Sequence, residues 1–266
     1  MSVTLTEVLA SLNEIAPLTL AGSWDNVGVL LEPEAEDASV SVGLVTIDLT
    51  EEVLAEAVAL NAQLIISYHP ILFGGAQSLR QDNPHARMVM SAVKHGITVY
   101  SPHTALDAVI GGVNDWLVRS LGEVHEITAL EPAADHPAPT GMGRRARLVK
   151  KLALDECVTR IKSYLALPHL RLARGHDGLI ETVAVCPGAG GSLLAGLRDV
   201  DLVITGEMRH HDVLALASRG TSVILTDHTN CERGYLPLLL KTLRGPELSA
   251  VEWHLSKADS DPLLIV

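Results

Sequence analysis

Residues 97–107 read ITVYSPHTALD, and residues 222–232 read SVILTDHTNCE. Each segment begins with a short β-branched and apolar run, which is typical of a buried strand, and continues into the pattern His-Thr-x-x-acid. This spacing places a histidine where the strand ends and a carboxylate about one helical turn later. Two copies in one chain predict a duplication, in which related halves present these side chains to a shared cleft.

The segments before each copy follow the same order. Residues 42–47 and 64–67 precede the first copy, and residues 182–186 and 202–205 precede the second. Helical patterns such as residues 51–60 lie between such apolar strands, which predicts sheets covered by helices on both faces. The expected fold class is α/β, duplicated into two similar α/β halves. The remaining strands are predicted at residues 27–31, 146–150 and 250–255, and the remaining helices at residues 84–95, 154–165, 191–197, 211–219 and 232–243.

A stretch rich in proline and glycine divides the chain near its middle. Residues 131–143 read EPAADHPAPTGMG, a composition typical of linkers between domains. We therefore expect a first half at residues 1–130, a linker at residues 131–143 and a second half at residues 144–266. The C-terminal segment from about residue 223 could instead pack on the first half.

The composition predicts an aliphatic core and an acidic surface. The chain has three Trp, four Tyr and one Phe, so the core must consist almost wholly of Val, Leu, Ile and Ala. It has 20 Lys and Arg against 32 Asp and Glu, which gives a formal charge of −12. Domains that bind nucleic acid usually present a basic face, so we expect no nucleic-acid partner. No apolar run reaches the roughly 18 residues of a membrane helix, so we expect no membrane partner.

Two features indicate a cytoplasmic protein. The N-terminus lacks the basic segment and apolar stretch of a signal peptide, and Thr4 with Glu7 has the spacing of a capping box. Cys157, Cys186 and Cys231 are odd in number and widely spaced, which favours reduced thiols over a disulfide framework. Cys231 could act as a nucleophile, but a buried structural thiol is the preferred interpretation because no base is shown to lie in reach.

Several side chains at strand ends are suited to bind metal. In doubly wound sheets ligands bind at the carboxyl ends of the strands, and His69, His103 and His228 follow predicted strands directly. Glu207 ends another strand. Imidazoles and carboxylates suit zinc, iron, manganese or nickel, and one carboxylate can bridge two ions. We interpret these residues as a dinuclear metal site in the cleft between the two halves.

A purely structural interpretation explains the same pattern. A threonine before a helix is commonly its N-cap, and an acid three residues later completes a capping box. Thr104 with Asp107, and Thr229 with Glu232, have this spacing. Both interpretations stay open at this point.

The glycine-rich turn at residues 186–192, CPGAGGS, resembles a phosphate-binding turn because it follows a strand and precedes a helix. Glu207 lies about where a ribose-binding acid would. The third glycine of that fingerprint is replaced by Leu193, so we interpret the segment as a turn that needs positive φ.

The only dense basic stretch is interpreted as a solvated strand face, with phosphate binding as the alternative; it consists of Arg144, Arg145, Arg147, Lys150 and Lys151.

Two other motifs have both a structural and a functional interpretation. Residues 24–28, WDNVG, predict an Asx-type turn with a packed indole before a strand. His210 and His211 open a helix whose N-terminal dipole disfavours protonated imidazole. One of these two histidines could act as a neutral acid or base; the alternative is a surface pair.

Taken together, the motifs resemble the YbgI-type, Ngg-interacting-factor-three-like family, which is also called the GTP cyclohydrolase 1 type 2 homolog family. They follow the family's order and extend over nearly the whole chain. The resemblance implies a duplicated fold with intertwined halves, two divalent metal ions and a toroidal homohexamer built as a trimer of dimers. The motifs are Trp24-Asp25-Asn26-Val27-Gly28, Ser67-Tyr68-His69-Pro70, Ser101-Pro102-His103-Thr104 with Asp107, Gly111-Gly112-Val113-Asn114, Thr205-Gly206-Glu207 with His211, and His228-Thr229-x-x-Glu232-Arg233-Gly234.

Carried over by position, the resemblance implies that His69, Asp107, His228 and Glu232 are metal ligands. The family's remaining ligand is usually a histidine directly before His69, and this chain has Tyr68 there. A phenol with an ordinary pKa near 10 is a poorer ligand than imidazole. We therefore predict one firmly held ion and a second that is held more weakly or is completed by a further histidine or water.

The leading hypothesis is a metal-dependent hydrolase of the GTP cyclohydrolase type that uses metal-activated water. Glu232, His211 and His103 are its candidate catalytic residues, and the physiological small-molecule substrate stays open. The alternative is a metal-binding scaffold, regulatory protein or chaperone without enzymatic activity, which acts through protein contacts.

Overall fold

The structure divides the chain into two units, and neither is continuous in sequence. In this computed structural model, residues 3–33, 38–73 and 78–264 are described. The first unit consists of Met1–Leu106 and Leu236–Pro262, and the second of Asp107–Tyr235 and Leu263–Val266. These bounds differ from the predicted division at residues 131–143. That stretch lies inside the second unit, where β8 (Glu131–Pro132) and β9 (Gly141–Met142) pair as an antiparallel hairpin.

A five-stranded sheet forms the centre of the first unit, in the order β15-β4-β5-β6-β2. The first four strands of this order are parallel, and β2 is antiparallel at the edge. Because β15 pairs with β4, the C-terminal segment from Leu236 contributes a strand to the first sheet, whereas residues 223–235 belong to the second unit. The strands are β2 (Gly28–Leu31), β4 (Val42–Thr46), β5 (Leu64–Ser67), β6 (Thr98–Ser101) and β15 (Glu252–Leu255).

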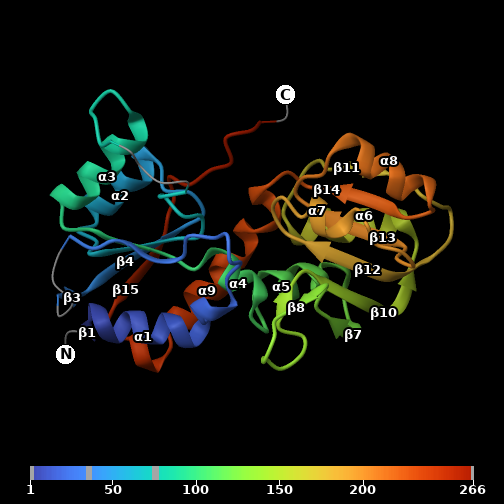
Figure 1. Cartoon of the computed structure of the whole chain (residues 1–266), viewed down its shortest axis with the longest axis horizontal. Helices are drawn as coiled ribbons and strands as arrows, with labels where there is room; N and C mark the ends of the chain where they lie inside the picture. The colour runs from blue at the N-terminus through green and yellow to red at the C-terminus, as the bar shows by residue number, and fades with distance from the viewer. Residues whose placement is uncertain (1–2, 34–37, 74–77, 265–266) are drawn as a thin grey trace. The chain divides into compact units, whose positions relative to one another are not determined.

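Helices cover both faces of the first sheet (Figure 1). One face carries α2 (Glu51–Ala59) and α3 (Pro84–Lys94), and the other carries α1 (Leu5–Ile15) and α9 (Leu236–Leu243). The cluster beneath α2 and α3 consists of Leu, Val, Ile and Ala, as the composition predicts. The predicted capping box of Thr4 and Glu7 is confirmed at the start of α1.

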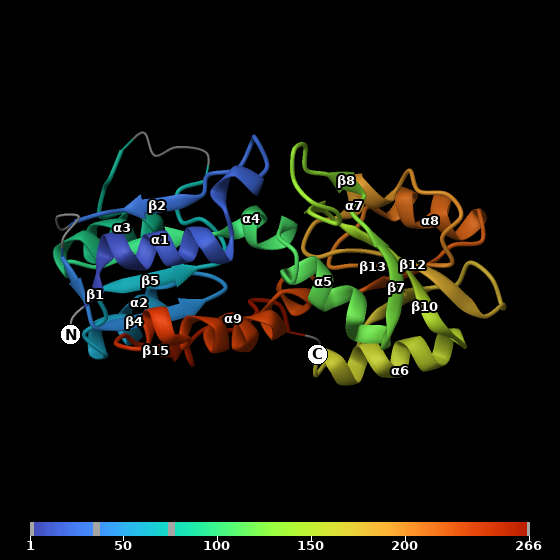
Figure 2. The ribbon, with the colours of Figure 1, turned by 90° about the horizontal axis from the view of Figure 1, so that it is seen from below.

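The second unit repeats this plan around a six-stranded sheet of order β11-β14-β13-β12-β10-β7. Its three parallel strands are flanked by antiparallel ones, with α5 and α6 on one face and α7 and α8 on the other (Figure 2). The strands are β7 (Val124–Thr128), β10 (Arg144–Leu152), β11 (Arg171–Ala173), β12 (Ile180–Cys186), β13 (Leu202–Thr205) and β14 (Ser222–Leu225). The helices are α5 (Val113–Val118), α6 (Leu154–Tyr164), α7 (Gly191–Leu194) and α8 (His210–Ser218).

The duplication is visible in the paired triplets β4-β5-β6 and β12-β13-β14, which are parallel and follow the same order. The first triplet leads into α4 (His103–Ala108), whereas the second leads into a 3-10 turn, Thr229–Cys231. A second 3-10 turn, Arg233–Tyr235, follows. The helix predicted to begin at residue 232 therefore begins four residues later, at Leu236.

The expectation for the basic stretch is wrong at one position. The basic stretch is not wholly a solvated strand face, because Arg144 at the start of β10 is fully buried. Its neighbour Arg145 is half-buried. None of the helices in the described part of the chain has the length and apolar content needed to cross a bilayer.

Candidate metal centre

In the first unit, polar side chains gather where the parallel strands end. Asp48 follows β4, His69 follows β5 and His103 follows β6. The backbone N–H of His69 donates to the carbonyl of Ile47 at 3.0 Å, which continues the ladder between β4 and β5 past its last paired residues. The sheet itself therefore brings Asp48 and His69 together.

The His69 ring is oriented by Asp48. Its Nδ1 atom lies 2.9 Å from Oδ1 of that carboxylate. A carboxylate in this position holds the proton on Nδ1 and makes Nε2 the nitrogen with which the imidazole would ligate a metal. Tyr68 is 2% exposed, and its ring packs against those of His69 and His103 at centroid distances of 5.1 and 5.7 Å.

A second carboxylate orients His103. Its Nδ1 atom lies 2.8 Å from Oδ1 of Asp25, whose side chain is fully buried. Burial is the largest influence on the Asp25 pKa and raises it, but hydrogen bonds from His103 and Thr104 bring the pKa below its ordinary value. His103 also has φ of +29°, a strained conformation that tends to occur at functional sites.

The predicted Asx-type turn forms, because the N–H of Asn26 donates to Oδ1 of Asp25 at 2.8 Å. The expectation of a packed indole is wrong, since Trp24 is 65% exposed. Its ring lies edge-to-face against His103 and against Phe73, each with a centroid distance of 6.2 Å. The turn therefore positions Asp25 for His103 and leaves the indole at the surface.

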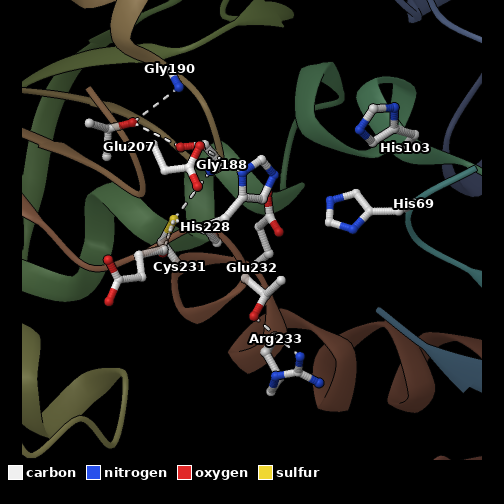
Figure 3. Close-up of polar contacts among 12 residues, drawn as sticks. His69, His103, Gly188, Gly190, Glu207, His228, Cys231, Glu232 and Arg233 are labelled. Carbon is white, nitrogen blue, oxygen red and sulfur yellow. Dashed lines mark hydrogen bonds and ion pairs between the residues drawn. The ribbon is translucent and has the colours of Figure 1, made fainter. Parts of the chain in front are cut away.

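In the second unit, His228 lies between two carboxylates (Figure 3). Its Nε2 atom is 3.6 Å from Oε1 of Glu232, and its Nδ1 atom is 3.4 Å from Oε2 of Glu207. The N–H of Glu207 donates to the carbonyl of Gly188 at 2.9 Å, which ties the end of β13 to the turn after β12. Glu207 is thus placed to orient His228 as Asp48 orients His69.

Gly188 leaves the space in which these side chains meet. It has φ of +59°, and a Cβ at this position would lie 2.5 Å from Oε1 of Glu232 and 3.0 Å from Nε2 of His228. The predicted positive-φ turn is confirmed. The missing side chain also makes room for the donor atoms, a role that the sequence pattern does not reveal.

Two carboxylates of the second unit are buried, and both act electrostatically on the thiol of Cys186. Asp107 is 6% exposed and Glu232 is 3% exposed. Burial raises the pKa of the Cys186 thiol well above its ordinary value, and the negative charges of Asp107 and Glu232 raise it further. Carboxylates and imidazole are the donors that divalent transition metals prefer, so this donor set fits such an ion.

The other sequence candidates lie in different surroundings. Cys231 is fully buried, burial raises its pKa and its Sγ accepts the N–H of Gly188 at 3.2 Å, so the structural-thiol interpretation is favoured. His210 and His211 are exposed on α8 with their rings 5.4 Å apart, which matches the predicted surface pair. The structural capping interpretation receives no support at Thr104, whose hydroxyl bonds the Asp25 carboxylate and the N–H of Gly22.

Two residues of the site escaped the sequence argument. Asp48 comes directly after the strand predicted at residues 42–47, and Asp25 lies in the WDNVG motif. Asp48 meets the criterion already applied to the histidines, namely a polar group at the carboxyl end of a strand, whereas Asp25 precedes its strand. A search for acids at every predicted strand end would have found Asp48.

A cavity of about 400 Å³ lies beside Glu207 in the second unit. The residues that line it include Gly191, Ser192, Arg209 and Asp212. A second cavity, of about 420 Å³, lies beside α2 and α3 in the first unit, but none of the candidate site residues lines it. The cavity beside Glu207 therefore adjoins the carboxylate that faces His228.

Comparison with known proteins extends these observations. Residues 3–262 match the model of the family Duf34/NIF3 (NGG1p interacting factor 3). A Drosophila melanogaster protein named NIF3-like protein 1 is 41% identical and covers 98% of this chain and 89% of its own length. The Saccharomyces cerevisiae protein NGG1-interacting factor 3 is 36% identical and covers 98% and 96%. The crystal structure of a Bacillus cereus protein related to NIF3 has the same fold, with a TM-score of 0.87, 20% identity and full coverage of both chains.

Proposed function

The chain belongs to the Duf34/NIF3 (NGG1p interacting factor 3) family, and from that premise we propose that it binds divalent metal and acts as a hydrolase. Its metal ligands would be His69, Asp107, His228 and Glu232. His69, His228 and Glu232 offer nitrogen and oxygen donors of the kind that hold a metal ion. Two ions, with zinc, iron, manganese and nickel as the candidates, complete the proposed centre.

The observation that carries the proposal is the arrangement around Gly188. Only a residue without Cβ leaves space for Oε1 of Glu232 and Nε2 of His228 at this turn. A helix cap would need a side-chain hydrogen bond at the start of the turn, and the 3-10 turn Thr229–Cys231 has none. The imidazole and carboxylate atoms beside Gly188 are therefore better explained as metal donors than as a cap. A bound divalent ion would lower the pKa of a coordinated water far below that of bulk water, towards about 7.

The chain's own residues supply the rest of the proposed chemistry. Asp48 and Glu207 hold the Nδ1 atoms of His69 and His228, so the opposite nitrogen of each ring ligates. His103 is the preferred proton carrier, because the contact of its Nδ1 atom with Asp25 holds the ring in one orientation. The exposed setting of His211 makes it the weaker of the two candidates for that role.

Tyr68 takes the place of the family's usual histidine. Its ring packs against His69 and His103 and is almost fully buried. We propose that the second ion is held more weakly than the first, with Tyr68, His103 or water completing its ligands. Titration of metal-free protein with Mn²⁺ or Zn²⁺ should then show two steps with separate affinities.

Comparison of the wild type with Glu232→Gln tests the hydrolase. Both proteins are assayed against phosphoesters, cyclic amides and nucleotides with Mn²⁺, Zn²⁺, Fe²⁺ or Co²⁺ supplied, and bound metal is measured by mass spectrometry. Glu247→Gln changes an exposed carboxylate and serves as the control. Turnover that needs both metal and Glu232 supports the proposal, whereas equal turnover in Glu232→Gln under limiting metal contradicts it.

A scaffold without enzymatic activity is the second candidate. The observation that favours it is the name of the yeast relative, NGG1-interacting factor 3, together with the −12 charge of this chain. Stoichiometric metal binding without turnover in the same assays would select the scaffold. In either role we propose a cytoplasmic homohexamer, and light scattering should then give six times the 28.4 kDa mass of one chain.

A further inference from the structure

A buried arginine of the second unit is saturated with hydrogen bonds. Arg144 is fully buried, and its Nε donates to Oδ1 of Asp115. The remaining donors of its guanidinium all bind backbone carbonyls, so all five N–H groups of the side chain are used. These bonds run from Nη1 to Gly141 at 2.7 Å and Gly143 at 2.8 Å, and from Nη2 to Ala108 at 3.2 Å and Val109 at 3.3 Å.

The same network extends along residues 107–111, which run from the last turn of α4 into the connection to α5. Asn114 Nδ2 donates to the carbonyl of Asp107 at 3.0 Å, and the N–H of Gly111 donates to Oδ2 of Asp115 at 2.6 Å. The hydroxyl of Tyr235 donates to the carbonyl of Gly111 at 3.1 Å. This segment has no strand partner, so side chains supply the bonds that a ladder would give.

Tyr235 connects this network to the other buried carboxylate. Its backbone N–H donates to the carbonyl of Glu232 at 2.9 Å, within the turn that follows His228. The backbones of Asp107 and Glu232 are therefore joined through Gly111 and Tyr235. A buried ion pair is a costly way to gain stability alone, because apolar replacements of similar volume are often neutral or better. The network is better explained by a need to fix the position of these two carboxylates.

We propose that Arg144, acting through Asp115 and the backbone of residues 107–111, is a positioning residue that holds Asp107 in place to bind metal. Tyr235 is its link to Glu232. This inference rests on the proposed metal centre. Arg144, Asp115 and Tyr235 then support the metal centre without binding the metal themselves. The sequence around Arg144 indicates only a basic strand.

The test is metal affinity rather than turnover. Metal-free wild type, Arg144→Lys and Tyr235→Phe are titrated with Zn²⁺ against a chromophoric chelator, and their thermal stability is measured in parallel. Tyr164→Phe is the matched control, because its hydroxyl also donates to a backbone carbonyl of the second unit, that of Trp116, at 3.2 Å. Tyr235→Phe keeps the ring and removes one bond, so it decides the matter even if Arg144→Lys does not fold.

Tyr235→Phe should weaken Zn²⁺ binding by about tenfold, the smallest loss that is usual when a residue supporting the metal ligands is changed. Arg144→Lys should weaken it by more. Tyr164→Phe should bind Zn²⁺ as the wild type does. Equal affinity in Tyr235→Phe and wild type overturns the inference, and so does equal weakening in Tyr235→Phe and Tyr164→Phe. If the wild type binds no Zn²⁺, both the proposed metal centre and this inference are overturned. The other two outcomes overturn only the role of the network and leave the metal centre in place.

Discussion

The Nδ1 atom of His69 lies 2.9 Å from a carboxylate oxygen of Asp48, and two further histidines repeat this relationship. His103 is paired with Asp25 at 2.8 Å, and His228 faces Glu207 at 3.4 Å. Carboxylates that face Nδ1 in this way fix the tautomer of metal-ligating histidines and raise their basicity. Histidines that end strands in both units therefore share one chemical environment, which fits ligands and proton carriers.

Asp48→Asn should weaken metal binding while the first unit stays folded. The amide keeps the shape of the side chain but gives the Nδ1 proton of His69 no negative partner, so the ring becomes a poorer ligand. The dissociation constant for Zn²⁺, measured by chelator competition, should rise roughly 10–100-fold. Asp82→Asn removes an exposed carboxylate of the same unit and is the control. An unchanged constant in Asp48→Asn would remove the orienting role from Asp48.

Gly188→Ala should reduce metal binding by more than its backbone strain explains. Its new Cβ would lie 2.5 Å from Oε1 of Glu232, so that side chain and His228 must move. Gly220→Ala is the matched control, because Gly220 also has positive φ, +89°, but nothing lies within 4 Å of its added Cβ. Both variants should lose about 1–2 kcal/mol in urea unfolding from the left-handed backbone alone. Equal metal affinity in the two variants would contradict the account of this hollow.

All three thiols should be unreactive in the native protein. Burial raises the pKa of Cys157 to about 11 and raises those of Cys186 and Cys231 as well. At pH 8 only roughly one Cys157 in a thousand would be thiolate, the reactive form. Ellman's reagent should therefore report all three cysteines after denaturation and almost none before it. Rapid reaction of the folded protein at pH 8 would show that one thiol is accessible and activated.

The C-terminal segment should be released from α2 in acid. Glu56 accepts hydrogen bonds from Oγ of Ser256 at 2.6 Å and from the N–H groups of Lys257 and Ala258 at 3.1 Å each. Burial, the largest influence, raises the pKa of Glu56, but these bonds outweigh it and leave the pKa below its ordinary value. A depressed pKa adds stability above the ordinary value, and that contribution is lost as the pH falls through the folded pKa.

Comparison with Glu56→Gln measures this contribution. The wild type should exceed the variant in free energy of unfolding at pH 7, and the difference should shrink as the pH falls below about 4.3, the ordinary pKa of glutamate. Glu14→Gln, at an exposed position of α1, should show no such trend. A difference between wild type and Glu56→Gln that stays constant from pH 7 to pH 3 would exclude the linkage.

Much of the fold follows from local sequence. The strands at residues 64–67 and 202–205 agree with β5 and β13, because parallel strands covered on both faces are continuous apolar runs with sharp ends. The division into units does not follow from local sequence. Residues 131–143 have the composition of a linker, yet they form a hairpin, and β15 crosses back to pair with β4. Non-local pairing of this kind leaves no trace in periodicity.

The site shows the same limit. The duplicated His-Thr-x-x-acid pattern predicts His103, Asp107, His228 and Glu232 as candidates, because side chains can converge where strands end. The burial of Arg144 could not be predicted from the sequence. Its partners are backbone carbonyls and the Asp115 carboxylate, and composition does not show whether an arginine binds such groups or water. The exposure of Trp24 was missed for a similar reason, because an apolar ring is expected to be packed.

The central claim is that His69, Asp107, His228 and Glu232 hold divalent metal. Anomalous diffraction from crystals of the protein as purified, collected on both sides of the zinc, iron, manganese and nickel absorption edges, tests it most directly. We expect an anomalous peak within coordination distance, about 2.0–2.2 Å, of Nε2 of His228 and a carboxylate oxygen of Glu232. Well-ordered side chains at both residues with no peak at any edge, in crystals also soaked with Zn²⁺, would contradict it.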